Sequence, residues 1–287
     1  MNKGQQRMIG VVLFLLALFF FVVQLAFIIV PSIVDVQFEY IDNRLFYVIN
    51  SVCALFLLLA CLVLLRLRKM GLAIGIGLFV IFVGVNIYLV QVVNDSMTHH
   101  IIHSPSDNHT LVLKYEEAEN QAVYYRPYYK LLARPMERLV DMESEPQINW
   151  VTADVAAITY VHSNGNINQF IATYGSRGGR ASYYNVVPEI QGHWQGDQSE
   201  VIVDTEGVTV IDGGRTETFT HDQTTQYGTL AAVLTTPSGE TRWTIALGEN
   251  FDFWSADRQA PSGTIRLYEA TMEENEAVTL EIVEGEL

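Results

Sequence analysis

Three long apolar runs occupy the first 94 residues and limit the possible folds more than any other feature of the chain. They cover residues 8–30, 45–65 and 71–93 and are 23, 21 and 23 residues long. A helix needs roughly 20 apolar residues to cross about 30 Å of hydrocarbon, so the runs predict three transmembrane α-helices. The first run is too long for a cleaved signal peptide and is followed by Pro31, which predicts an uncleaved anchor that ends there.

The charges beside these runs predict their orientation. Lys3 and Arg7 precede the first run, three basic residues fill the turn at residues 66–69, and the loop at residues 31–44 is acidic on balance. Basic residues are enriched in cytoplasmic loops. The N-terminus and the 66–69 turn are therefore predicted to be cytoplasmic, and everything after residue 93 extracytoplasmic. The expected location is a plasma membrane that the chain crosses three times.

Charge divides the chain into two unlike parts. Residues 1–94 hold six basic and three acidic residues, whereas residues 95–287 hold 11 basic and 29 acidic residues. A strongly negative outer part repels nucleic acid and anionic lipid headgroups, so neither is an expected partner of this domain. The lipid bilayer is the expected partner of the three helices. Cys53 and Cys61, the only cysteines, are about 12 Å apart along one predicted helix. They are too far apart for a disulfide, and the outer part has none.

Three amide side chains interrupt the apolar runs. Gln24, Asn50 and Asn86 all lie roughly 8–10 Å below the outer end of their helices, counted at 1.5 Å per residue. One hypothesis is an interhelical polar layer in which these amides bond one another. In the other, each amide bonds its own backbone or extends its polar end toward the membrane surface. Because no charged residue lies within the runs, a self-contained channel or transporter is not expected.

The outer part has the pattern of a β protein. Short alternating segments punctuated by Asn164-Gly165, Glu206-Gly207, Gly213-Gly214 and residues 237–239 predict a mostly antiparallel all-β domain over residues 111–287, as a sandwich, barrel or partial propeller. A helix is expected only at residues 130–142. Residues 95–110 form the connector from the membrane. The expected strands lie within residues 111–115, 121–129, 154–163, 166–175, 181–190, 199–207, 208–214, 215–222, 229–248, 263–270 and 277–285.

Four of the seven histidines lie in this connector, at His99, His100, His103 and His109. If the third helix continued for one turn, His103 would share a face with His99 or His100 and offer imidazoles to Zn²⁺ or Cu²⁺. No complete tetrahedral ligand set accompanies them, so the sequence predicts no metal site and keeps these three as weak candidates. The alternatives are a pH-responsive patch and a plain connector.

No catalytic motif is visible. The chain has no G-x-S-x-G elbow, no H-E-x-x-H, no phosphate-binding loop, no C-x-x-C and no calcium loop. We therefore expect neither an enzyme nor a cofactor. A hydrolase whose site is assembled from distant residues is the alternative.

Aromatic and basic side chains suggest one ligand surface in the outer domain. Tyr124, Tyr125 and Tyr128 offer aromatic faces with polar tips, and Arg177 and Arg180 form a basic island suited to a carboxylate or phosphate. The competing interpretation is that the tyrosines pack the faces of a sheet and the arginines lie in a solvated loop.

The segments HSPSDNHTLVLKYE, NWVTADVAAITYVHSNGNINQFIATYG, ASYYNVVPEIQGHW and VIVDTEGVTVIDG, within residues 103–213, resemble the outer domains of uncharacterised multi-pass membrane proteins of low-GC Gram-positive bacteria. The resemblance spans most of residues 103–250 and is one of overall pattern, without a catalytic motif. It implies a cell-membrane location with an extracytoplasmic domain and no particular activity.

The resulting hypothesis is an integral plasma-membrane protein that displays an extracytoplasmic β domain for binding or sensing. Its partner would be another membrane protein, a cell-wall component or a secreted peptide. A cell-envelope hydrolase and an accessory subunit of a membrane complex remain as alternatives.

Overall fold

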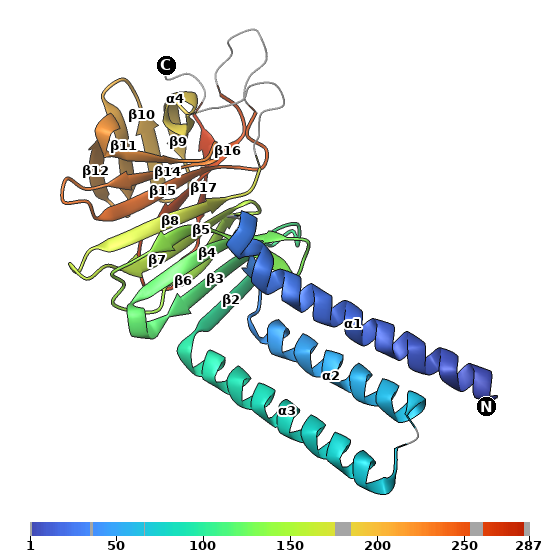
Figure 1. Ribbon diagram of the computed structural model, residues 1–287. Helices are drawn as coiled ribbons and strands as arrows, with labels where there is room; N and C mark the ends of the chain where they lie inside the picture. Colours follow the sequence, from blue (N-terminus) through green and yellow to red (C-terminus); the bar gives the residue numbers. More distant parts are fainter. Residues whose placement is uncertain (1, 35–36, 66, 176–184, 253–260, 284–287) are drawn as a thin grey trace. The chain divides into compact units, whose positions relative to one another are not determined.

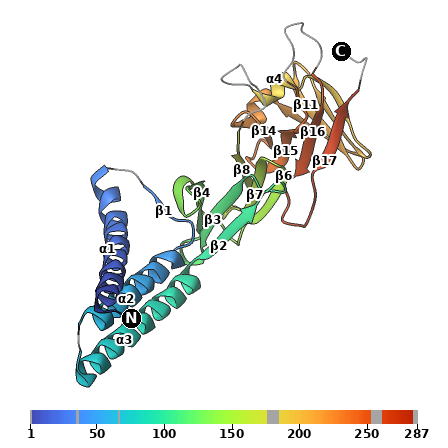
Figure 2. The same cartoon turned by 90° about the vertical axis from the view of Figure 1, so that its right-hand side faces the viewer.

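A computed structural model describes residues 2–34, 37–65, 67–175, 185–252 and 261–283 (Figures 1 and 2). The chain divides into two compact units, which are described separately. The first holds the helices together with residues 112–118 and 123–138. The second holds residues 101–111, 119–122 and 139–287.

The three transmembrane helices are confirmed as long apolar helices: α1 (Lys3–Val34), α2 (Arg44–Leu64) and α3 (Lys69–Ser96). The helix α2 packs against both α1 and α3 (Figure 1). Pro31 does not end α1, because a proline in the last turn removes only one hydrogen bond and the helix continues to Val34. Most large apolar side chains of the three helices are exposed, as expected of helices that contact lipid.

A five-stranded antiparallel sheet accompanies the helices, in the order β1-β5-β4-β3-β2. The short β1 lies in the loop between α1 and α2 and pairs with β5, with Glu39 opposite Ala133 and Tyr40 opposite Leu132. The α1–α2 loop is therefore held at the edge of the sheet. The strands are β1 (Glu39–Tyr40), β2 (Thr98–His103), β3 (Thr110–Glu116), β4 (Gln121–Tyr128) and β5 (Leu132–Leu139), with a 3₁₀ turn η1 (Glu117–Glu119) between β3 and β4.

The helix expected at residues 130–142 is wrong, because this segment forms β5. Tyr129 and Lys130 both have positive φ angles, 50° and 61°, and make a tight turn that returns the chain from β4 to β5. Pro135, which argues against an interior helical position, is tolerated in β5 because the pairing with β1 stops at Ala133. The strand therefore loses no bond to β1 at the proline.

The second unit contains a three-stranded sheet, β6-β7-β8, and a nine-stranded antiparallel sheet in the order β12-β11-β10-β9-β17-β16-β15-β14-β13. All four predicted hairpin turns join consecutive strands. Residues 186–189, expected in a strand, form the short helix α4 (Val186–Glu189). The strands are β6 (Gln147–Thr152), β7 (Val155–Val161), β8 (Ile167–Thr173), β9 (Gly192–Gln195), β10 (Ser199–Val203), β11 (Gly207–Asp212), β12 (Arg215–Thr220), β13 (Thr224–Tyr227), β14 (Ala231–Thr235), β15 (Thr241–Leu247), β16 (Thr264–Glu269) and β17 (Val278–Ile282).

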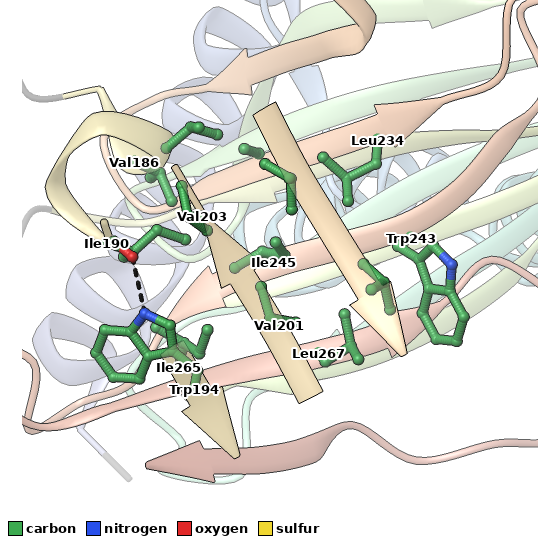
Figure 3. Packing of buried hydrophobic residues seen from close by; sticks show 14 of the residues in the cluster. Val186, Ile190, Trp194, Val201, Val203, Leu234, Trp243, Ile245, Ile265 and Leu267 are labelled. Carbon is green, nitrogen blue, oxygen red and sulfur yellow. Dashed lines mark hydrogen bonds between the residues drawn. The ribbon is translucent and has the colours of Figure 1, made fainter. Parts of the chain in front are cut away.

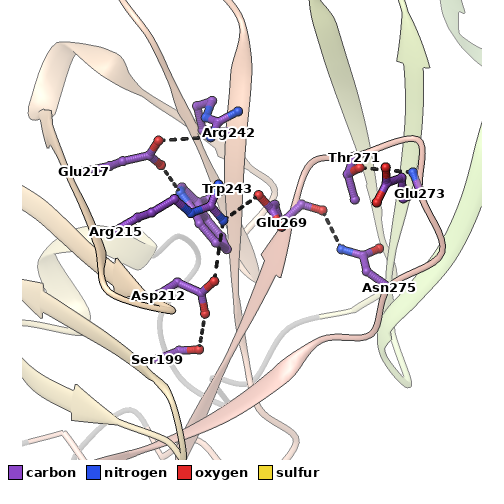
Figure 4. Close-up of polar contacts among 10 residues, drawn as sticks. All are labelled: Ser199, Asp212, Arg215, Glu217, Arg242, Trp243, Glu269, Thr271, Glu273 and Asn275. Carbon is purple, nitrogen blue, oxygen red and sulfur yellow. Dashed lines mark hydrogen bonds and ion pairs between the residues drawn. The ribbon is translucent and has the colours of Figure 1, made fainter.

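The sequence left three β architectures open: a sandwich, a barrel or a partial propeller. The nine-stranded sheet forms a nearly closed barrel. Its two edge strands, β12 and β13, are consecutive in the chain and are joined only by the 3₁₀ turn η2 (His221–Gln223), so the two edges must approach each other. Side chains of β12 also reach across to β16 and β15: Arg215 bonds Glu269 at 3.1 Å, and Glu217 accepts from Arg242 at 3.0 Å (Figure 4). These contacts require a strongly curved sheet.

Apolar side chains on one face of this sheet form the largest core (Figure 3). Trp194 of β9 is fully buried there, and its indole N–H donates to the Ile190 carbonyl at 2.8 Å. Gly207 opens β11 at a point where a side chain has no room, since a Cβ there would lie 2.0 Å from the Phe219 carbonyl oxygen. The position therefore requires glycine.

Candidate functional site

The most unusual side chain in the first unit is Lys114, a lysine buried in β3 with 1% of its side chain exposed. Its ammonium donates three hydrogen bonds: to the Glu39 carboxylate at 2.8 Å, the Tyr40 carbonyl at 2.9 Å and the Asn43 side-chain oxygen at 2.7 Å. An ammonium has three N–H groups, so every donor is used. A buried lysine is tolerated only when it is paired in this way.

Tyr125 of β4 completes this group. The Lys114 ammonium lies 4.4 Å from the centre of the Tyr125 ring, within cation–π range, and the tyrosine hydroxyl donates to Glu39 at 3.1 Å. Burial, reinforced by the Glu39 charge, raises the pKa of Tyr125 well above its ordinary value. Burial also lowers the pKa of Lys114, although the hydrogen bond to Glu39 acts in the opposite direction. We call Glu39, Tyr40, Asn43, Lys114 and Tyr125 the Lys114 cluster.

The Lys114 cluster is connected to α1, to the N-terminal end of α2 and to the residue that follows α3. The Tyr40 hydroxyl donates to the Gln24 side chain of α1 at 3.4 Å, and Gln24 in turn donates to the Phe46 carbonyl of α2 at 3.1 Å. Asn43 lies at the N-terminal end of α2, and its amide donates to the sulfur of Met97, the residue that follows α3, at 3.5 Å. A single buried cation therefore lies at the centre of contacts between the sheet and three helices.

Sequence reasoning missed the Lys114 cluster. One signal was present: Lys114 lies inside the otherwise apolar segment at residues 111–115, and the α1–α2 loop carries acidic residues that a buried lysine would need. The pattern alone cannot select Glu39 as the partner, because the two residues are 75 positions apart in the chain.

The predicted polar layer stays a prediction, and its members differ in surroundings. Gln24 is buried and bonds α2, as described above. Asn86 is buried and donates to the Phe82 carbonyl of its own helix at 2.9 Å. It also lines a groove of about 610 Å³ between α2 and α3, together with Ser51 and Gln91. Asn50 is half-buried in α2.

The histidine-rich connector does not continue α3 as a helical turn. The helix ends at Ser96, and His99, His100 and His103 lie in strand β2, where His100 faces the opposite side from the other two. The shared helical face that the metal hypothesis needs is therefore not formed. His103 bonds Thr110 at 3.0 Å, and His109 stacks on Tyr174. Among the described residues, no group of three His, Cys, Asp or Glu side chains is placed to hold a metal ion.

We expect His99 to make the first unit sensitive to acid. Its Nε2 atom is buried with no hydrogen-bond partner among the described residues, and Asp42, Lys114 and Arg44 are the charged groups near it. Burial lowers its pKa below the ordinary 6.5, although Asp42 acts in the opposite direction. The folded state then binds fewer protons than the unfolded state, so stability should fall as the pH drops below about 6.5. Thermal unfolding from pH 7.5 to 5 should show a weaker pH dependence in His99→Gln than in the wild type; equal slopes would contradict this role.

The tyrosine and arginine ligand surface is only partly accessible. Tyr124 and Tyr125 are both 5% exposed, so neither presents an open aromatic face, whereas Tyr128 is 59% exposed. The strand β4 is covered on both sides at this point, which the alternation pattern did not indicate. Arg177 and Arg180 lie outside the described residues.

The exposed tip of the β4–β5 hairpin is expected to contact the lipid interface. Tyr128, Tyr129 and Leu131 are 59%, 83% and 56% exposed. The Leu131 carbonyl accepts from the backbone of Ile41, three residues before α2 begins at Arg44. Tyrosine is enriched where a membrane meets water. The test uses a spin label at Tyr129→Cys in a protein with Cys53 and Cys61 changed to alanine. The label should be more accessible to dissolved oxygen, which is enriched in lipid, than to a water-soluble nickel complex. A label at Ser238→Cys is the aqueous control, and equal nickel access at both sites would contradict this placement.

No protein-family model, curated protein or solved structure matches the chain.

Proposed function

We propose that the chain is an integral membrane protein whose three helices hold an extracytoplasmic β region for binding or sensing at the cell surface. The observation that carries this proposal is the Lys114 cluster. A flexible linker would be enough to anchor a domain passively. Here a buried cation with all its donors used joins the sheet to the outer ends of three helices, so a displacement on either side costs hydrogen bonds on the other.

The outward orientation rests on the basic residues beside the helices, and the resemblance to membrane proteins of low-GC Gram-positive bacteria supports a plasma-membrane location. The proposal assigns no reaction to the protein. Its partner would be another membrane protein, a cell-wall component or a secreted ligand.

Protease treatment of intact cells tests the proposal. Added protease should remove an epitope tag placed after residue 287 and leave an N-terminal tag in place. In inside-out vesicles the N-terminal tag should be the one removed. Protection of the C-terminal tag on intact cells, with cleavage in inside-out vesicles, would contradict the proposal.

A further inference from the structure

A cleft in the second unit is lined by three side chains that each carry a buried polar atom without a hydrogen-bond partner among the described residues. It lies where β6 packs against β16, has a volume of about 360 Å³, and is lined by Asn149, Trp150, Glu249, Arg266, Tyr268 and Asn275 among others. We call it the β6–β16 cleft. Its volume lies within the roughly 300–1,000 Å³ that small-molecule sites occupy.

Three of its lining residues carry a buried polar atom with no hydrogen-bond partner among the described residues. These atoms are the indole nitrogen Nε1 of Trp150, the guanidinium nitrogen Nε of Arg266 and the side-chain oxygen Oδ1 of Asn275. Each unpaired buried group costs about 1–3 kcal/mol, so proteins rarely keep them without a reason. Three such residues line this one cleft.

Each of these side chains makes one other contact, which identifies the atom that is left unpaired. The Asn275 amide donates its N–H to the Glu269 carbonyl at 2.9 Å (Figure 4), so the free end of this amide is its oxygen. Arg266 donates from Nη1 to Thr279, and the Trp150 ring lies against Tyr174 with ring centres 5.6 Å apart. Asn149 donates to the Tyr268 hydroxyl at 2.7 Å. The buried unpaired groups are therefore two N–H donors, one of them cationic, and one carbonyl acceptor.

These three groups define the chemistry of a ligand. The cationic donor of Arg266 and the indole N–H of Trp150 suit a carboxylate, because hydrogen bonds between charged groups are the stronger ones. The Asn275 oxygen needs a donor on the same ligand. Glu249 and Glu276 also line the cleft and attract a positive donor. The smallest common ligand with a carboxylate beside a cationic donor is an α-amino acid.

We propose that the β6–β16 cleft binds a free α-amino acid, with its carboxylate at Arg266 and Trp150 and its ammonium group at Asn275. The inference names a ligand class for the binding role above and rests on that proposed function. Because the three atoms are covered in the unliganded protein, binding requires the Trp150, Arg266 and Asn275 side chains to shift so that these atoms face the cleft.

Isothermal titration of the full-length protein in detergent with each of the twenty common L-amino acids tests the inference. At least one should bind saturably at one site. Its amide and its N-acetyl derivative should bind roughly 10- to 100-fold more weakly, the effect expected when one charged hydrogen bond is lost. Binding by none of the twenty, or equal binding of the amide, would overturn the inference.

Two variants connect the binding to the cleft. Trp150→Phe and Arg266→Gln should each weaken binding roughly 10- to 100-fold. Trp150→Phe should also unfold at the wild-type temperature or above, because it removes a buried unpaired donor. Trp243→Phe is the matched control: its indole N–H already bonds Glu217 at 2.5 Å, so the variant should lose stability and keep its affinity. Unchanged affinity in both cleft variants would refute the site. Binding in detergent does not depend on membrane orientation, so this result and the protease test can fail separately.

Discussion

Replacing Glu39 with alanine is expected to lower the melting temperature of the first unit by roughly 5–15 °C, which corresponds to about 2–4 kcal/mol. The variant leaves the buried Lys114 ammonium without a counter-ion, and the value is set below that for a fully buried pair because 44% of the Glu39 side chain is exposed. Thermal unfolding of the full-length protein in detergent, followed by circular dichroism, measures the change. Glu137→Ala, on the exposed surface of β5, is the control and should change stability by no more than about 0.5 kcal/mol.

The pH dependence of the stability loss in Glu39→Ala tests whether the buried charge of Lys114 causes it. Burial lowers its folded-state pKa below the ordinary 10.5, and loss of Glu39 removes an interaction that raises it. Below the folded-state pKa the buried lysine is charged, and its full destabilising effect on the folded state is present. The free energy of unfolding then increases as the pH rises from the folded-state pKa towards 10.5. The defect of Glu39→Ala should shrink in alkaline buffer. Adding Lys114→Met to Glu39→Ala should also restore part of the stability, since the two residues are in contact. A defect that is independent of pH and simply adds to that of Lys114→Met would contradict the role of the cluster.

Replacing Trp194 with alanine is expected to destabilise the second unit by about 3–5 kcal/mol. The side chain is fully buried in the core of the nine-stranded sheet, stacks on Phe251 with ring centres 6.1 Å apart, and bonds the Ile190 carbonyl (Figure 3). The variant leaves a cavity and an unpaired carbonyl.

Trp194→Phe separates the two contributions, because it keeps an aromatic ring and removes only the N–H donor and part of the volume. Denaturant unfolding followed by near-ultraviolet circular dichroism should place its midpoint between those of the wild type and Trp194→Ala. If Trp194→Ala unfolds at the same denaturant concentration as the wild type, the side chain does not hold this core together.

The helices were predictable because the thickness of the membrane sets the length of the apolar run that each helix needs, and such a run can be read from the sequence alone. The expected run at residues 45–65 differs by one residue at each end from α2 (Arg44–Leu64), whereas α1 and α3 extend past the expected runs. Extra turns outside the hydrocarbon need no apolar residues, so the apolar pattern cannot show them. Strands with a Gly-containing turn between them were predicted for a similar local reason, since residues such as Gly165 take positive φ angles at little cost.

Other strands depended on partners far away in the chain. The segment at β5 contains helix-compatible residues, and its pairing with β1 and β4 decided its structure. The histidine-rich β2 likewise forms by joining the edge of the five-stranded sheet. In both cases tertiary contacts outweighed local preference.

The candidate site was less predictable than the fold. Lys114 and Glu39 meet only because β1 pairs with the edge of the sheet. The register of that pairing cannot be predicted from the sequence of either segment. Tyr125 was selected for its aromatic face, but the structure buries it against Lys114. The partnerless atoms of Trp150, Arg266 and Asn275 become visible only when β6 is packed against β16.

Cysteine labelling on intact cells tests the central claim, an outward-facing β region, most directly. Ser238→Cys lies in the exposed β14–β15 turn, and Lys69→Cys lies at the start of α3. The native Cys53 and Cys61 are within the α2 span, so the unmodified protein gives the background. A membrane-impermeant maleimide should label Ser238→Cys on intact cells and Lys69→Cys only after permeabilisation. Labelling of Lys69→Cys but not Ser238→Cys on intact cells would place the β region on the cytoplasmic side and contradict the account.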